Sequence, residues 1–208
     1  MRPWATNLRL SPFRRAWLLV PLLASYLQVS PIRRGWLWVP LLTANSARAE
    51  TGLTKEQVLT LAFPNAKIER HEHFLTEAQK ARVNELSGTE LKTRFIVAYE
   101  ARQEGQLVGV AIFDTHVVRT LPETAMVALS ANGTVVRVEV VQFREPDEYR
   151  APAAWVRQLE GKVLSPSLSL KAEIHPLSGA SLTAGALVDA SRRVLALFQL
   201  LYGSKPLP

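Results

Sequence analysis

The sequence predicts an α+β fold: an antiparallel sheet with N-terminal helices and a long C-terminal helix. Two observations carry this prediction. Four apolar runs between residues 94 and 143 alternate in the manner of strands and follow one another through short turns, which is typical of an antiparallel meander. Apolar residues instead recur at helical spacing near residue 60 and again over residues 182–201. Helices before and after an uninterrupted set of strands are typical of the α+β class.

Two helices are expected before the main strands, and each is preceded by a capping-box pattern. Thr54 and Gln57 begin the first helix, which Pro64 ends. Thr76 begins the second helix with the same spacing, and that helix ends near Gly88. The sequence therefore defines both ends of each helix.

The strands form the centre of the predicted fold. Asn132-Gly133 lies between two alternating apolar runs and is a strong signal for a tight hairpin. A more polar alternating stretch between the two helices predicts one further strand. The expected strands cover residues 67–75, 94–103, 107–118, 124–131 and 134–143.

Three elements are expected after the strands. A short helix over residues 153–159 carries Trp155, and residues 165–174 are expected to be extended. The last element is a long helix over residues 182–201, which Gly203 ends. No linker composition divides residues 50–208, so a single domain is expected there.

Charge is divided unevenly along the chain. The 208 residues include 25 Lys and Arg against 18 Asp and Glu, a formal net charge of +7. Residues 1–49 contain seven arginines and no acidic residue, which leaves residues 50–208 formally neutral with 18 of each sign. The basic charge therefore gives no reason to expect a nucleic-acid partner for the domain.

Residues 1–49 have the order of an export signal. Arginines come first, apolar runs follow, and Ala47-Arg48-Ala49 provides a small-residue cleavage site. No apolar run reaches the ~18–20 residues that span a bilayer as a helix. We expect either a cleaved signal peptide or an uncleaved membrane anchor. The protein would be exported to the periplasm or held on the outer face of the cytoplasmic membrane.

The leader is longer than the usual ~15–30 residues because it is duplicated. The stretch from Ser11 to Ala24 is echoed by the stretch from Ser30 to Thr43, with an offset of 19 residues. The chain thus divides into a duplicated leader at 1–49 and a domain at 50–208.

Cysteine is absent, and this excludes disulfides, Cys-ligated metals and thiol catalysis. Histidine offers one possible metal site. His71 and His73 lie on one face of a predicted strand, and a third ligand from His116 would complete a zinc or copper site. The alternative is a solvated polar strand. Arg192 and Arg193 in the last helix are interpreted as part of a solvated face.

The segment before the last helix is rich in small residues and hydroxyls. Ser178, Ser181 and Thr183 supply hydroxyls, while Gly179 and Ala180 allow close approach to the backbone. Free N–H groups at a helix N-terminus favour an anion such as phosphate. Simple capping of the helix is the alternative interpretation.

This segment resembles the signature of the FMN-binding domain family, which includes flavin-carrying subunits of sodium-translocating NADH:quinone reductase and of Rnf-type electron-transport complexes. The pattern Ser-Gly-Ala-Ser-x-Thr occupies residues 178–183, at the start of a helix. Residues 131–141 resemble the family's dG-x-I/V-x-x-V hairpin. They lead to Phe143-Arg144-Glu145-Pro146 in the place of its ETPG segment, and a helix with Trp155 follows. The order of these features matches the family over most of residues 90–200.

The resemblance implies an exported electron carrier rather than a stand-alone enzyme. In this family FMN is joined through its phosphate to the last Thr of the signature, here Thr183, by a separate flavinyltransferase. Membrane or periplasmic redox partners would exchange electrons with the flavin. The residues that would shape the phosphate-binding turn are Ser178, Gly179, Ala180, Ser181 and Leu182.

Other residues are candidates to contact the flavin. Arg119 is a candidate to pair with the FMN phosphate, and His116 is a candidate to hydrogen-bond to the ring or to a partner. The alternative is that both are surface residues at a strand end. Tyr149 and Trp155 are candidates to cover the isoalloxazine ring.

Two positions depart from the family pattern. His175 stands where an acidic residue is common, and Arg144-Glu145-Pro146-Asp147 replaces ETPG. The flavinyltransferase reads the first of these motifs. Three alternatives therefore stay open: FMN bound covalently to Thr183, FMN held without a covalent bond, and a ligand- or protein-binding module without flavin.

Overall fold

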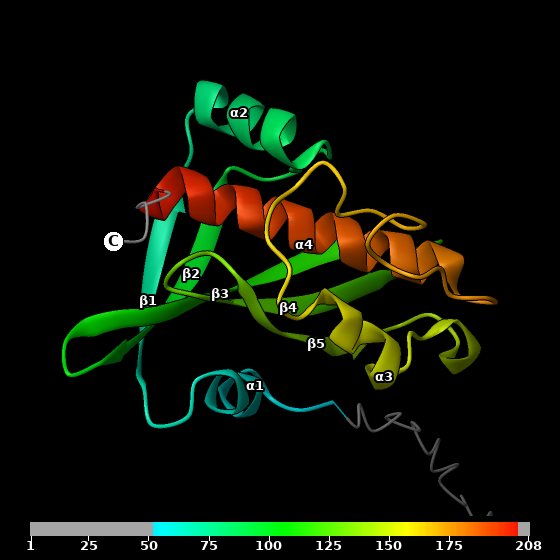
Figure 1. Ribbon diagram of the computed structural model, residues 1–208, viewed down its shortest axis with the longest axis horizontal. Coiled ribbons are helices and arrows are strands. Elements are labelled where there is room, and N and C mark those ends of the chain that lie inside the picture. The colour runs from blue at the N-terminus through cyan, green and yellow to red at the C-terminus, as the bar shows by residue number, and fades with distance from the viewer. Residues whose placement is uncertain (1–51, 204–208) are drawn as a thin grey trace, which may run out of the picture. The chain divides into compact units, whose positions relative to one another are not determined.

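A five-stranded antiparallel sheet with strand order β1-β2-β3-β4-β5 forms the centre of the structure (Figure 1). The computed structural model describes residues 52–203, so the predictions for the leader lie outside the described residues. Every neighbouring pair of strands is antiparallel, which confirms the predicted meander. The strands are β1 (Lys67–Phe74), β2 (Phe95–Gln103), β3 (Gln106–Val117), β4 (Pro122–Ser130) and β5 (Val135–Phe143).

Helices lie on both faces of the sheet (Figure 1). The long α4 packs along one face and α2 packs against α4, while α1 covers part of the opposite face. Helix α3 and two short 3₁₀ turns lie in the connection from β5 to α4. The predicted α+β class is thus confirmed. The bounds are α1 (Lys55–Ala62), α2 (Glu77–Ser87), η1 (Asp147–Tyr149), α3 (Ala153–Val156), η2 (Arg157–Leu159) and α4 (Ser181–Tyr202).

Both N-terminal helices have complete capping boxes. In α1 the Thr54 hydroxyl accepts the N–H of Gln57, and the Gln57 side chain accepts the N–H of Thr54. Thr76 and Gln79 repeat this arrangement in α2. Helix α4 differs, because its N-cap residue is Ala180 and no side chain there caps the helix.

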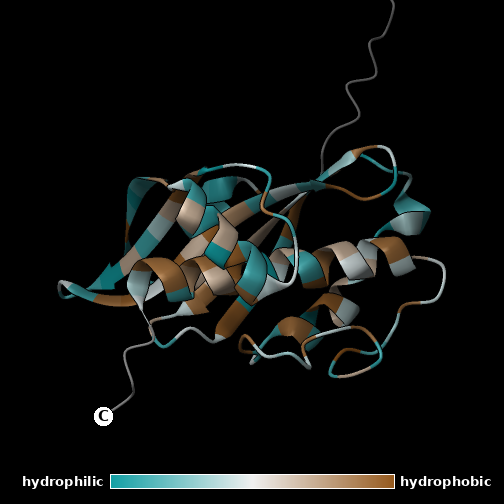
Figure 2. Ribbon diagram, turned by 90° about the horizontal axis from the view of Figure 1, so that it is seen from above, coloured by the Kyte–Doolittle hydropathy of each residue, from teal (hydrophilic) through white to brown (hydrophobic). Residues whose placement is uncertain are grey.

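Each face of the sheet has its own apolar core. The larger core lies between the sheet and α4, and it includes Val127 on β4 and Leu187 on α4. The smaller core lies under α1 around Phe63 and Met126. Figure 2 looks from the side of α2 and α4 and shows polar residues interspersed with the apolar ones on these helices. Within residues 52–203, no helix combines the length and the apolar character needed to cross a membrane.

The segment over residues 165–174 is folded into turns, so the prediction that it is extended was wrong. Its serine side chains form local hydrogen bonds: Ser165 accepts the N–H of Leu168 at 3.1 Å and donates to Glu173 at 2.9 Å. Serine hydroxyls that bond locally compete with strand pairing in this way. Arg192 then fixes the loop by donating to the carbonyls of Ser165 and Leu168, both at 2.9 Å. Arg192 therefore binds this loop instead of belonging to a solvated face.

Gly109 on β3 lies where a larger residue does not fit. A Cβ atom at this position would overlap the ring of Phe63 and the carbonyl oxygen of Leu129. We expect Gly109→Ala to lower the free energy of unfolding by ~1–3 kcal/mol, because overpacking forces neighbouring groups to shift. Urea denaturation measures this change. Gly185→Ala in α4 is the matched control, since its Cβ would meet Leu170 at an ordinary 3.8 Å. Equal losses in the two variants would contradict the prediction.

Candidate functional site

A small pocket lies at the first turn of α4. Three separate parts of the chain form it: the β3–β4 turn, η1 and the segment that begins α4. Its volume is about 100 Å³, which is enough for a group the size of phosphate. The lining residues are Arg119, Tyr149, Gly179, Ala180, Ser181, Leu182 and Thr183.

The backbone before α4 forms part of the lining of this pocket. Gly179 has a φ of 83°, a left-handed conformation that glycine adopts without strain. Ala180 follows as the N-cap residue and provides no side-chain acceptor. The first N–H groups of a helix have no acceptor within the helix, and here the N-cap side chain does not supply one. The first turn of α4 therefore presents donors and the positive end of the helix dipole.

Arg119 adds a positive charge to the pocket. Its guanidinium lies 4.4 Å from the centre of the Tyr149 ring, in a cation–π contact. The residue itself is exposed, so this contact holds the guanidinium at the lining without burying it. Arg119 thus lines the same pocket as residues 179–183, and its pairing with an FMN phosphate stays a prediction.

Thr183 lies at the third position of α4 and joins the helix to η1. Its hydroxyl donates to the carbonyl oxygen of Tyr149 at 2.6 Å, and the residue is only 1% exposed. A phosphoester on the same oxygen would remove the hydrogen that is donated. This hydrogen bond and a covalent flavin on Thr183 therefore exclude each other.

Three of the predicted site residues do not line this pocket. Ser178 is exposed one residue before Gly179, and His116 lies elsewhere. Trp155 is buried in the larger core, where its indole N–H donates to the carbonyl oxygen of His175 at 2.8 Å. Trp155 thus anchors the segment that leads to α4 from inside. The structure gives it no exposed face with which to cover a flavin ring.

His116 belongs to a row of four ionisable side chains beneath α4, which we call the ion chain. Its Nδ1 lies 2.9 Å from Asp114 Oδ1 and its Nε2 lies 2.9 Å from Glu123 Oε2. Arg193 of α4 donates to both oxygens of Asp114, at 2.8 and 2.7 Å. All four side chains are at most 10% exposed. Positive and negative groups alternate along the ion chain when His116 is protonated.

The ion chain shifts the pKa values of Asp114 and His116. Burial raises the pKa of Asp114, but hydrogen bonds from Arg193 and His116 outweigh it and lower the pKa to about 2. Burial lowers the pKa of His116, but hydrogen bonds to Asp114 and Glu123 outweigh it and raise the pKa to about 9. His116 is therefore charged at neutral pH, held between two carboxylates.

The interpretation of Arg193 as part of a solvated face was wrong. Asp114 attracts its guanidinium into the space between α4 and the sheet, and the burial of one charge is compensated by the other. A sequence signal for this contact existed. On α4, Arg193 is spaced at helical intervals from the buried apolar residues. On β3, Asp114 and His116 follow Val110 and Ile112 at every second position, so they are expected on the same face of the strand.

Because of the ion chain, we expect the free energy of unfolding to fall at alkaline pH. The pKa of His116 rises from 6.5 in the unfolded chain to about 9 in the folded one, so folding favours the protonated form. Its contribution, on the order of 3 kcal/mol, is complete below pH 6.5 and is lost as the pH rises through 9. Urea unfolding between pH 6 and 10, together with the imidazole NMR titration of His116, measures this effect. An imidazole midpoint near 6.5 would contradict it.

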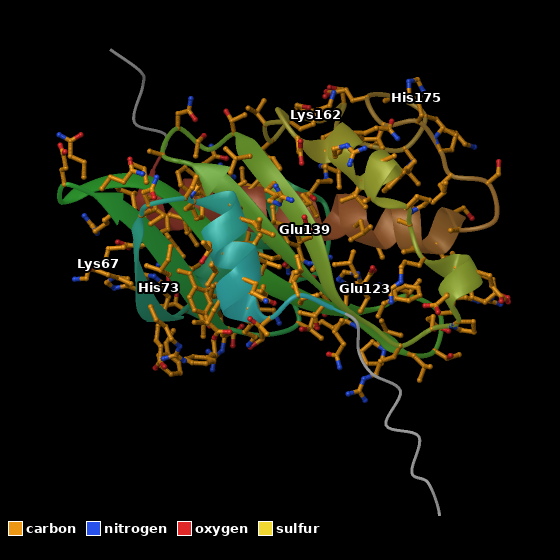
Figure 3. All side chains as sticks on the ribbon, turned by 90° about the horizontal axis from the view of Figure 1, so that it is seen from below. Lys67, His73, Glu123, Glu139, Lys162 and His175 are labelled. Carbon is orange, nitrogen blue, oxygen red and sulfur yellow. The ribbon has the colours of Figure 1, made fainter. Side chains whose placement is uncertain are left out.

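The proposed histidine metal site is not assembled. Within residues 52–203, which include all four histidines, no group of three or more His, Asp or Glu side chains is placed to hold a metal ion. His73 packs edge-on against the Tyr202 ring, with 6.3 Å between the ring centres. Figure 3 shows His73 well separated from Glu123, the ion-chain partner of His116. The structure gives the metal hypothesis no support.

Comparison with known proteins adds no assignment. No protein-family model matches the sequence, and no curated protein matches it significantly. The features that point to a function are the pocket at α4 and the short motifs that form it.

Proposed function

We propose that the protein is an exported flavoprotein that holds FMN by its phosphate at the first turn of α4 and carries electrons. One observation supports this most strongly: the fold brings Arg119 to the same pocket as residues 179–183, about sixty positions later in the chain. A phosphate dianion is stabilised by a helix N-terminus and by a guanidinium. The pocket offers both groups.

The size of the pocket suggests how FMN lies. In this proposal the phosphate occupies the pocket of about 100 Å³, and the ribityl chain and the ring extend outward from it. Leu182 at the pocket is 58% exposed and offers an apolar surface beside this path. A flavin ring held at the surface is accessible to a redox partner. The proposal thus favours an electron carrier over a stand-alone enzyme, with the protein binding and orienting a cofactor that supplies the redox chemistry.

Thr183 is the proposed attachment residue. For the ester to form, its hydroxyl has to leave the carbonyl of Tyr149 and turn toward the phosphate position. A flavinyltransferase acting after export would form the bond from a flavin dinucleotide: its pyrophosphate bond breaks, the nucleoside monophosphate leaves, and the Thr183 hydroxyl gives up its proton. The buried, hydrogen-bonded state of this hydroxyl favours a second candidate, in which Arg119 and α4 hold FMN without a covalent bond. Both candidates place the phosphate at the same site.

Export is part of the proposal and depends on residues 1–49, which carry seven arginines, apolar runs and a small-residue cleavage site. The partners would be redox proteins of the membrane or the periplasm. A protein with this leader would meet the flavinyltransferase and its electron donor outside the cytoplasm.

A visible absorption spectrum tests the proposal. The protein is purified from a host that contains a flavinyltransferase, and spectra are recorded before and after acid precipitation. We expect flavin bands that stay with the precipitated protein. Bands that move to the supernatant would support the candidate without a covalent bond. A colourless protein would overturn the proposed function.

A further inference from the structure

Glu145 is a buried carboxylate that binds the β3–β4 turn from a distant part of the chain. Its Oε1 accepts the backbone N–H groups of Thr120 at 2.7 Å, Leu121 at 2.8 Å and Arg119 at 3.3 Å. The Thr120 hydroxyl also donates to it, at 3.3 Å. The residue is 7% exposed. A single oxygen thus collects the donors of three consecutive residues.

The hydrogen bonds that Glu145 accepts are stronger than those between neutral groups. Hydrogen bonds to a carboxylate are charge-assisted. The pKa of Glu145 lies below its usual value because backbone N–H groups donate to its carboxylate. Those of Thr120 and Leu121 contribute most, and that of Arg119 contributes less. Glu145 is therefore ionised at neutral pH, and its charge is satisfied by the turn. Within the turn, the N–H of Val118 donates to the carbonyl of Leu121 at a longer 3.2 Å.

The turn held by Glu145 is the one that carries Arg119 to the pocket. The guanidinium of Arg119 lies over the ring of Tyr149, four residues after Glu145, and the carbonyl of Tyr149 accepts the hydroxyl of Thr183. The segment 145–149 therefore fixes the backbone of Arg119, supports its side chain and contacts α4. Of the lining residues, Tyr149 belongs to this segment and Arg119 is held by it.

We infer that Glu145 is a positioning residue for phosphate binding, acting through Arg119. This inference rests on the proposed function, since the ligand class is a phosphate monoester such as FMN. Glu145 does not touch the pocket. It holds the turn in the conformation that aims the guanidinium at the position of the phosphate.

A double-mutant cycle tests this role. Protein made without flavinyltransferase is titrated with FMN by fluorescence, and separately with inorganic phosphate by NMR of the amides of residues 179–183. The variants are Glu145→Ala, Arg119→Ala and the double variant. Glu148→Ala is the matched control, because Glu148 is an exposed carboxylate of the same segment. Glu145→Gln keeps an acceptor oxygen and serves if the alanine variant does not fold.

We expect Glu145→Ala to weaken FMN binding about tenfold, Arg119→Ala to weaken it at least as much, and Glu145→Gln to retain more affinity than Glu145→Ala. The double variant should bind as weakly as Arg119→Ala alone, because Glu145 acts through Arg119. A purely structural role would give additive losses and overturn the inference. Tighter binding by both Glu145 variants would also overturn it, because Glu145 would then act as a repelling charge.

The outcomes separate this inference from the proposed function. If the protein binds FMN and Glu145→Ala binds it equally well, the inference alone fails. If the protein binds inorganic phosphate but not FMN, and Glu145→Ala weakens the phosphate shifts, the inference stands and the flavin assignment fails. If the protein binds neither ligand, both fail.

Discussion

Thr183→Val is expected to abolish covalently bound flavin while leaving the protein folded. Valine has the shape of threonine and lacks only the hydroxyl to which the phosphate would be joined. The carbonyl of Tyr149 loses its donor, so a loss of about 1 kcal/mol in the free energy of unfolding accompanies the change. The flavin content after acid precipitation and a urea denaturation curve measure the two effects.

Ser181→Ala is the matched control for Thr183→Val. Ser181 is exposed in the same turn of α4 and lines the same pocket. Its removal should leave the covalent flavin in place, since a neighbouring hydroxyl is not the attachment point. If covalent flavin survives Thr183→Val and disappears in Ser181→Ala, the attachment residue is Ser181. This result would contradict the role given to Thr183.

Arg193→Met is expected to cause the largest loss of stability, about 3–5 kcal/mol. Methionine fills similar space but leaves Asp114 without the guanidinium that donates to both of its oxygens. Removing one partner of a buried ion pair leaves an uncompensated charge, which is more destabilising than replacing both partners. Chemical denaturation at pH 7 measures the loss. Arg157→Met, at an exposed arginine, is the control and should change stability little.

The double variant Asp114→Asn/Arg193→Met tests the origin of this loss. If the energy comes from an uncompensated charge, the double variant should be clearly more stable than the sum of the two single losses predicts. Additive losses would show instead that Arg193 contributes by packing alone.

Signals within a few residues predicted most of the fold. The capping boxes at Thr54 and Thr76 located the starts of α1 and α2, and Asn132-Gly133 located the β4–β5 hairpin. The segment over residues 165–174 was the exception. Its serines form local hydrogen bonds, and Arg192, a residue of another element, holds two of its carbonyls. No local pattern reveals the contacts of Arg192.

The part of the candidate site that comes from one continuous motif could be predicted from the sequence. Residues 179–183 lie together because they are consecutive, and Arg119 was a candidate because a charged strand end is unusual. Glu145 was missed as a functional residue because its partners lie about 25 positions earlier in the chain. Trp155 was assigned to the flavin ring from chain order alone, and the packing of the larger core places it inside.

Peptide mass mapping of the protein purified with a flavinyltransferase tests the central claim most directly. Trypsin cleaves after Lys171 and Arg192, so one peptide, residues 172–192, carries the whole segment that begins α4. We predict that this peptide carries FMN through a phosphoester and that fragmentation places it on Thr183. An unmodified peptide from a protein that contains no flavin would contradict the assignment.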